Sequence, residues 1–205
     1  MRICYININD YNNEQWEKIR DNLPWEERKI KADKYRFKED RYRCIGAGAL
    51  LYKMLQDTGI GDYTMAKGKD DKPYLINSED VHFNISHSND YAICALDCMP
   101  VGIDIEQRKD ANIKVAKRFF TKKEYEWIID NDSDIRFNRI WTLKESYVKY
   151  KGVGIKLPFN EFEVMPEFGK LPEGASFYEY EIGDYHVAVC TASDNQPKLE
   201  KIKLI

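Results

Sequence analysis

The stretch from Val101 to Glu106 (Val-Gly-Ile-Asp-Ile-Glu) constrains the fold more than any other part of the sequence. In a β-strand successive side chains point to opposite faces, so Ile103 and Ile105 share one face while Asp104 and Glu106 share the other. The isoleucines predict a strand anchored in a core. Two neighbouring carboxylates repel each other and resist desolvation unless a cation lies between them. The stretch therefore favours a cation site on this strand.

A third acid follows in the predicted helix that contains residues 141–149. Trp141, Glu145 and Lys149 are spaced i, i+4 and i+8, so they lie along one helix face. If that face meets the acidic strand, three carboxylates converge on one hard cation beside a lysine, which in outline is a Mg²⁺ and phosphate site. The alternative is structural: acids on a half-exposed strand are common, and Glu145 with Lys149 can be a helix ion pair of roughly 0.3–0.5 kcal/mol.

Length and composition limit the class of protein. The 205 residues are 43% apolar and 33% charged, which is typical of a soluble protein of one domain or two small packed ones. Neither a secretory signal nor a stretch of roughly 18 apolar residues is present, so no membrane association is expected. The cysteines are scattered at positions 4, 44, 94, 98 and 190, which favours a reducing cytoplasm over disulfides or zinc.

The net charge of −3 argues against general nucleic-acid binding, but one segment is strongly basic. Residues 28–43 contain eight lysines and arginines against three acids. A local positive excess on an acidic protein indicates a confined anion site. The alternative is a pair of solvated helices, which accounts for most of these lysines.

The order of predicted elements favours an α+β fold made of two similar halves, residues 1–100 and 101–205. The first half predicts a strand over 2–9, helices near 14–22, 25–37 and 39–58, an extended piece at 72–75, and strands over 81–86 and 91–96. The second predicts a strand over 101–106, helices over 113–119, 121–129 and 134–151, strands near 159–165, 176–182 and 185–191, and a final strand containing Leu199.

Local signals set several of these boundaries. Thr121 and Glu124 form a capping-box pattern, and Asp134 is the predicted cap of the long second-half helix. Gly152 is expected to end that helix, and Gly183 with Asp184 predicts a hairpin turn.

Phe-Asn-Ile-Ser-His-Ser (residues 83–88) places hydroxyls and an imidazole at the end of a strand. Ser86 and His87 suit the binding of phosphate oxygens or the movement of a proton. Alternatively, the polar side chains cap backbone amides in a turn. His82 and His186 alternate with apolar residues and are interpreted as structural. No glycine-rich nucleotide-binding loop of the common kinds is present.

Taken together and in this order, five segments resemble the 4′-phosphopantetheinyl transferases of the surfactin-synthetase-activating type. They are Lys-Pro-Tyr-Leu (72–75), Phe-Asn-Ile-Ser-His-Ser (83–88), Gly-Ile-Asp-Ile-Glu (102–106), Arg-Phe-Phe-Thr-x-x-Glu (118–124) and Trp-Thr-Leu-Lys-Glu-Ser-Tyr-Val-Lys (141–149). The resemblance extends from about residue 2 to residue 191. It implies two similar halves packed as a pseudo-dimer within one chain, acting as a cytoplasmic monomer.

The resemblance also implies the activity and the site. The family transfers phosphopantetheine from coenzyme A to a serine of an apo acyl or peptidyl carrier protein, and it requires Mg²⁺. The residues that match the family's metal ligands are Asp104, Glu106 and Glu145. Those that match its coenzyme A contacts are Arg28, Lys31, Arg43, Lys72, Pro73, Ser86, His87 and Lys149. Asp71 stands where the family commonly has glycine.

The chemistry that follows is a phosphoryl transfer with three candidate catalytic residues. Lys149 and Mg²⁺ neutralise charge on the pyrophosphate, and Glu145, directly or through a metal-bound water, or else His87, takes the serine proton. Two rival functions remain open at this level. One is a Mg²⁺-dependent phosphodiesterase or nuclease, and the other is a non-enzymatic module that binds an anionic partner through residues 28–43.

Overall fold

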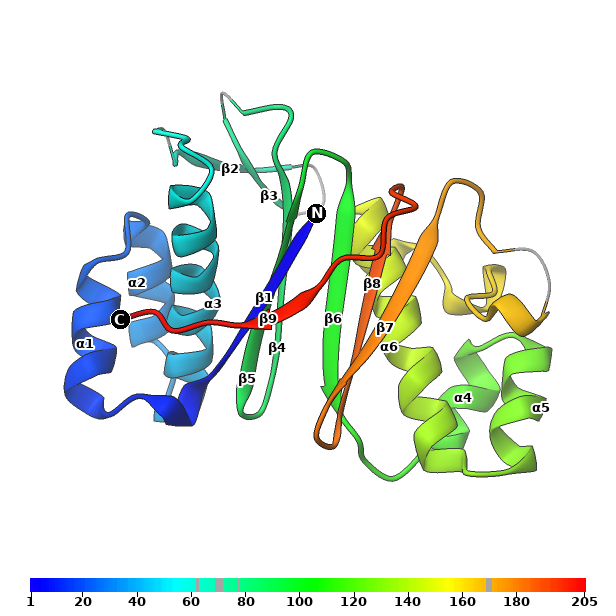
Figure 1. Cartoon of the computed structure of the whole chain (residues 1–205). Helices are drawn as coiled ribbons and strands as arrows, with labels where there is room; N and C mark the ends of the chain where they lie inside the picture. The colour runs from blue at the N-terminus through cyan, green and yellow to red at the C-terminus, as the bar shows by residue number, and fades with distance from the viewer. Residues whose placement is uncertain (62, 69–71, 77, 169–170) are drawn as a thin grey trace. The chain divides into compact units, whose positions relative to one another are not determined.

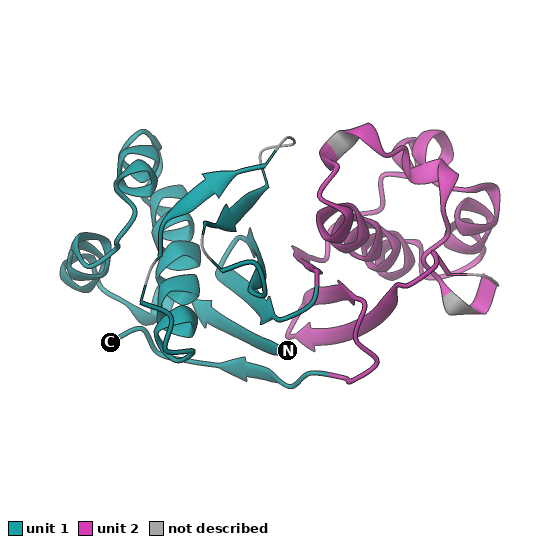
Figure 2. Cartoon of the chain, turned by 90° about the horizontal axis from the view of Figure 1, so that it is seen from above, with its two compact units in different colours: residues 1–99, 197–205 teal, residues 100–196 magenta. Residues whose placement is uncertain are grey.

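The structure is a computed structural model that describes all residues except 62, 69–71, 77 and 169–170 (Figure 1). The chain divides into two compact units (Figure 2). Unit 1 comprises Met1–Met99 together with Pro197–Ile205, and unit 2 comprises Pro100–Gln196. The expected division near residue 100 therefore needs one correction, because the last segment of the chain contributes to unit 1.

Unit 1 contains a four-stranded sheet in the order β4-β5-β1-β9. Its strands are β1 (Arg2–Asn7), β4 (His82–Ser88), β5 (Tyr91–Asp97) and β9 (Leu199–Lys201). Strand β9 pairs with β1 in parallel, whereas the other pairs are antiparallel. A separate antiparallel pair consists of β2 (Met65–Lys67), which the sequence did not predict, and β3 (Pro73–Leu75).

The helices of unit 1 are α1 (Asn13–Asp21), α2 (Glu26–Asp33) and α3 (Lys38–Gln56), with a 3₁₀ turn, η1, at Ile8–Asp10. Trp16, Leu50 and Met54 are fully buried in the core that these helices share with the sheet. The predicted helix over 25–37 is too long. Phe37 has extended backbone as the N-cap of α3, so the chain must leave helical geometry between α2 and α3.

Unit 2 contains a three-stranded antiparallel sheet in the order β6-β8-β7. Its strands are β6 (Val101–Gln107), β7 (Ser176–Ile182) and β8 (Tyr185–Thr191). The predicted hairpin between β7 and β8 is confirmed, and Gly183 adopts the left-handed backbone (φ 60°) that its turn requires.

The helices of unit 2 are α4 (Ile113–Phe119), α5 (Lys122–Asp130) and α6 (Ser133–Lys151), with 3₁₀ turns η2 (Gly154–Lys156), η3 (Phe159–Glu161) and η4 (Pro166–Phe168). The capping box of Thr121 and Glu124 is confirmed. The prediction that Asp134 caps α6 is wrong. Asp132 is the N-cap, and the Asp134 carboxylate accepts a hydrogen bond from the Ala111 amide at 2.7 Å. Gly152 ends α6 in left-handed backbone, as predicted.

The predicted strand at 159–165 is wrong, because the backbone carbonyls of this segment bind a side chain instead of a neighbouring strand. The Lys144 ammonium donates to the carbonyl oxygens of Phe159 and Phe162 at 2.7 and 2.6 Å. It also lies 2.9 Å from Glu124 Oε2, and both side chains of this ion pair are completely buried. Glu124 thus has two tasks, since it caps α5 and neutralises the charge of Lys144.

This buried pair generates a stability prediction. Lys144→Met should lower the free energy of unfolding by about 3–5 kcal/mol, because the Glu124 carboxylate would stay buried without its counter-charge. Urea denaturation measures the change. Lys123→Met, which removes an exposed lysine from α5, is the matched control and should change stability little. A loss below about 1 kcal/mol for Lys144→Met would contradict this account.

Candidate active site

The site in unit 2 depends on a close approach between strand β6 and helix α6. A Cβ atom on Gly102 would lie 2.1 Å from the Ser146 carbonyl oxygen and 2.2 Å from the Tyr150 amide nitrogen. Those separations are impossible for a real side chain, so only glycine allows the two backbones to come this close. The contact brings the face of β6 that includes Gly102 and Asp104 against the helix.

Asp104 is the most buried of the predicted acids. Its side chain is only 5% exposed, and its Oδ1 atom lies 2.6 Å from the Lys149 ammonium. Ile103 and Ile105 are fully buried, and Asp104 is buried as well, so exposure does not alternate along this part of β6. The structure therefore brings Asp104 together with Lys149 from α6, whereas Glu106 is half-buried further along the strand.

Glu145 shares this electrostatic environment. Burial raises the pKa of its carboxyl group above the ordinary value, and the charge of Asp104 raises it further. The Lys149 ammonium acts in the opposite direction and lowers the pKa, while Glu106 contributes a smaller increase. The three predicted carboxylates and the predicted lysine thus act on one another within unit 2.

This donor set suits a hard divalent cation, because carboxylate oxygens are the ligands that Mg²⁺ prefers and an added cation would relieve the repulsion that raises the Glu145 pKa. However, the arrangement does not contain a closed coordination shell. Within the described part of the chain, no three or more His, Cys, Asp or Glu side chains are close enough together to hold a metal ion. The chemistry of the residues fits Mg²⁺, and Lys149 supplies the positive charge next to Asp104 in this structure.

In unit 1 the predicted histidine lies at the end of the β4–β5 hairpin. His87 is exposed, whereas the flanking Ser86 and Ser88 are each 8% exposed. Arg43 lies beside this hairpin, and its guanidinium donates a hydrogen bond to the Asn89 carbonyl oxygen at 2.8 Å. The structure therefore brings Arg43, which is far away in sequence, to the turn that presents His87.

The other predicted basic residues differ in their surroundings. Arg28 lies flat on α3, where its guanidinium donates to the Cys44 carbonyl oxygen at 3.0 Å. Its aliphatic part fills the space above Gly48, since a Cβ there would lie 2.3 Å from Arg28 Cδ. Lys31 is exposed to solvent on α2. These two residues are not equivalent, because Arg28 is held against α3 whereas Lys31 is exposed.

The predicted turn at Lys72 and Pro73 leads into β3, with Pro73 opposite Lys67 in the β2–β3 pair. The Lys72 carbonyl oxygen accepts a hydrogen bond from the Gly68 amide at 2.9 Å. Asp71, which replaces the family's usual glycine, lies outside the described residues.

Sequence reasoning missed the part played by Lys144 in holding α6. A signal was present: Ile140, Lys144 and Tyr147 follow the i, i+4, i+7 spacing of the buried helix face, and a lysine on such a face requires a counter-charge.

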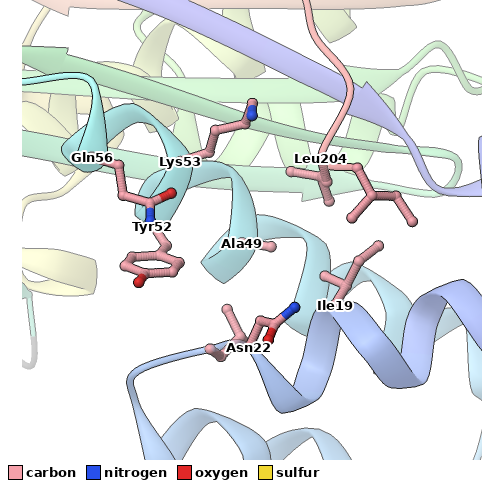
Figure 3. Close-up of a pocket in the computed structure, with 9 residues that line it drawn as sticks. Ile19, Asn22, Ala49, Tyr52, Lys53, Gln56 and Leu204 are labelled. Carbon is pink, nitrogen blue, oxygen red and sulfur yellow. The ribbon is translucent and has the colours of Figure 1, made fainter.

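A cavity of about 300 Å³ between α1, α3 and the chain end in unit 1 (Figure 3) contains none of the predicted site residues.

Comparison with known protein families shows which family the chain belongs to. Residues 100–190 match the family described as "4'-phosphopantetheinyl transferase superfamily", and residues 10–99 match "4'-phosphopantetheinyl transferase, N-terminal". The chain is also 34% identical to 4'-phosphopantetheinyl transferase Sfp of Bacillus subtilis over 84% of each protein. The chain belongs to the 4′-phosphopantetheinyl transferases. It is an enzyme of the transferase class.

Further relatives carry the same activity in their names. The chain is 38% identical to 4'-phosphopantetheinyl transferase gsp of Aneurinibacillus migulanus over 60% of this chain and 54% of that protein. It is 32% identical to the mouse L-aminoadipate-semialdehyde dehydrogenase-phosphopantetheinyl transferase over 85% of this chain and 60% of that protein. A structural likeness to Thermotoga maritima holo-[acyl-carrier-protein] synthase has a TM-score of 0.39 at 20% identity and covers 45% and 62% of the two chains, which is too low to support a conclusion.

The contact at Gly102 generates a prediction for this transferase. Gly102→Ala should force β6 and α6 apart and lower transferase turnover by about 100-fold, because Asp104 and Lys149 would no longer meet. The rate of carrier modification and the melting temperature are the measurements. Gly61→Ala, at an open position with no atom within 4 Å and no left-handed backbone, is a glycine control that should affect stability only slightly. Normal turnover of the Gly102 variant would show that the close approach is not required.

Proposed function

We propose that this protein transfers the 4′-phosphopantetheine group of coenzyme A to a serine hydroxyl of an apo acyl or peptidyl carrier protein. The products are the holo carrier protein and adenosine 3′,5′-bisphosphate. The observation that carries the proposal is the Asp104–Lys149 pair on the β6–α6 contact, with Glu145 and Glu106 in the same electrostatic environment. Membership of the transferase family and the anion-binding chemistry of the residues support it.

In this proposal Asp104, Glu106 and Glu145 hold Mg²⁺, which when bound polarises the pyrophosphate oxygens of coenzyme A. Lys149 provides a positive charge next to Asp104. As the bond between the β-phosphorus and the bridging oxygen breaks, negative charge grows on the leaving phosphate, and an ammonium stabilises it most at that moment. Lys149 is therefore a catalytic residue, in addition to a contact for coenzyme A.

The carrier serine must lose its proton as it attacks. Glu145 is the proposed general base, directly or through a metal-bound water, because its carboxylate shares the electrostatic environment of Asp104 and Lys149. His87 is the alternative base, since its imidazole is exposed on the β4–β5 hairpin.

The coenzyme A contacts are proposed in unit 1. Lys31, Arg43 and Arg28 supply positive charge for the 3′-phosphate, Ser86 and His87 contact phosphate oxygens, and the Lys72–Pro73 turn receives the adenine. The location of Arg43 beside the His87 hairpin supports the first two assignments.

We also propose that the two units are similar halves of a pseudo-dimer. Each has a 19-residue helix, α3 or α6, that packs on a sheet. We propose that the enzyme acts as a monomer in the cytoplasm, without nucleic acid or membrane partners. The free cysteines support a reducing compartment, and none of the described helices is both long and apolar enough to cross a bilayer.

The decisive experiment is mass spectrometry of an apo carrier protein incubated with this enzyme, coenzyme A and Mg²⁺. We expect the carrier to gain one phosphopantetheine and a carrier lacking the acceptor serine to gain none. The Asp104→Asn enzyme should be slower by about 10²–10³-fold. Cleavage of nucleic acid or phosphate esters without any carrier would instead favour a phosphodiesterase, and anion binding with no reaction would favour a binding module.

A kinetic prediction separates binding from catalysis at Lys149. Lys149→Ala should lower kcat and not merely raise KM for coenzyme A, because the ammonium stabilises charge that grows in the transition state. Lys151→Ala, which removes an exposed lysine from the same helix, is the control and should behave like the unmodified enzyme. An unchanged kcat with a higher KM would reduce Lys149 to a substrate anchor.

A second prediction concerns recognition of the 3′-phosphate. Lys31→Ala and Arg43→Ala should weaken the binding of coenzyme A more than that of 3′-dephospho-coenzyme A, because each removes a charge that attracts the 3′-phosphate. Calorimetric titration with both ligands measures the difference. Lys34→Ala removes an exposed charge from the same segment and controls for general electrostatics. An equal loss of affinity for both ligands would show that these residues do not recognise the 3′-phosphate.

A further inference from the structure

Three charged or polar side chains outside the predicted site join helix α6 to two strands. Arg139 of α6 donates two parallel hydrogen bonds to Glu179 of β7, from Nε to Oε2 at 2.6 Å and from Nη2 to Oε1 at 2.7 Å. The Nε2 atom of His186 on β8 lies 2.9 Å from the same Oε2 atom. These three residues are called the Arg139 cluster below.

Short hydrogen bonds link the three side chains of the cluster and their charges. His186 is only 6% exposed, and the two-pronged geometry between Arg139 and Glu179 fixes both side chains. Burial alone would raise the pKa of Glu179, but the hydrogen bonds from Arg139 and His186 outweigh it and bring the pKa to about 2. Glu179 is therefore ionised at any physiological pH.

Its position relates it to the proposed active site. His186 stands directly opposite Glu106 in the pairing of β8 with β6, so their side chains share one face of the sheet. Along α6, Arg139 is one attachment to the sheet, and the contact of Ser146 and Tyr150 with Gly102 is another. Glu145 lies in the helix between these two attachments.

We propose that the Arg139 cluster positions Glu145 for the transfer reaction by fixing the first half of α6 against β7 and β8. Without it, the first half of α6 loses its hydrogen-bonded attachment to β7 and is held by non-directional apolar packing, in which Phe137 and Ile140 take part, so that this part of the helix can shift relative to the strands. A cavity of about 210 Å³ beside the cluster provides room for such a movement. Small displacements of a reacting group are costly, since a shift of about 1 Å can reduce the rate about 100-fold.

Two conservative variants test the inference, which rests on the proposed function. Arg139→Lys keeps the charge but cannot form two parallel hydrogen bonds, and Glu179→Gln keeps the shape but loses the charge. Arg108→Ala is the matched control. It breaks the ion pair with Glu181 at the same cavity, and neither residue of that pair belongs to α6.

Hydrogen exchange of the α6 amides and steady-state kinetics are measured for each variant. We expect amides in the first half of α6 to exchange at least about tenfold faster in both cluster variants. We expect kcat to fall by roughly 10- to 100-fold while KM for coenzyme A changes less than about twofold. The Arg108 variant should match the unmodified enzyme in both measurements.

Failure of the inference and failure of the proposed function give different results in these measurements. Unchanged kcat in both cluster variants, with or without a lower melting temperature, would leave the cluster a purely structural feature and overturn the inference. Unchanged exchange in α6 would overturn it as well, because the helix would then be fixed by other contacts. If the unmodified protein modifies no carrier protein, the proposed function fails, whereas the exchange measurement still decides whether the cluster fixes α6.

Discussion

The near-contact of two backbones at Gly102 is the constraint on which unit 2 depends. No side chain fits at position 102 between β6 and the last turns of α6, so the two backbones approach each other there more closely than ordinary packing permits. Asp104 is buried beside this contact, and the Lys149 ammonium lies 2.6 Å from its Oδ1 atom. A positive charge at this distance offsets much of the cost of burying a carboxylate.

Two further charge clusters, one buried and one half-buried, also hold α6. Lys144 binds Glu124 and the carbonyls of Phe159 and Phe162, and Arg139 binds Glu179. These contacts are hydrogen bonds and ion pairs, which depend on direction. The apolar residues of the same helix stabilise it through the hydrophobic effect, which does not depend on direction. The combination specifies the rotation of α6 about its axis, which determines which side chains face β6.

The sequence predicted those features that depend on neighbouring residues. The strand β6, the Thr121 capping box, the β7–β8 hairpin and the end of α6 at Gly152 all depend on local sequence, and all are confirmed. The strand expected at 159–165 was wrong because Lys144, 15 and 18 residues away from its acceptors, captures their carbonyls. The pairing of Asp104 with Lys149 spans 45 residues, and helix spacing predicted it only in outline.

The final segment of the chain has a practical consequence for dissecting this enzyme. Strand β9 lies beside β1, with Leu199 opposite Ile3, and Lys201 forms an ion pair with Asp10 at 2.8 Å. A fragment that stops at Gln196 would leave β1 with an open edge, which invites pairing with other molecules. The two units therefore cannot be obtained as separate fragments by a single cut, and a circularly permuted chain that joins 197–205 directly to the start of β1 is the better route to an isolated first unit.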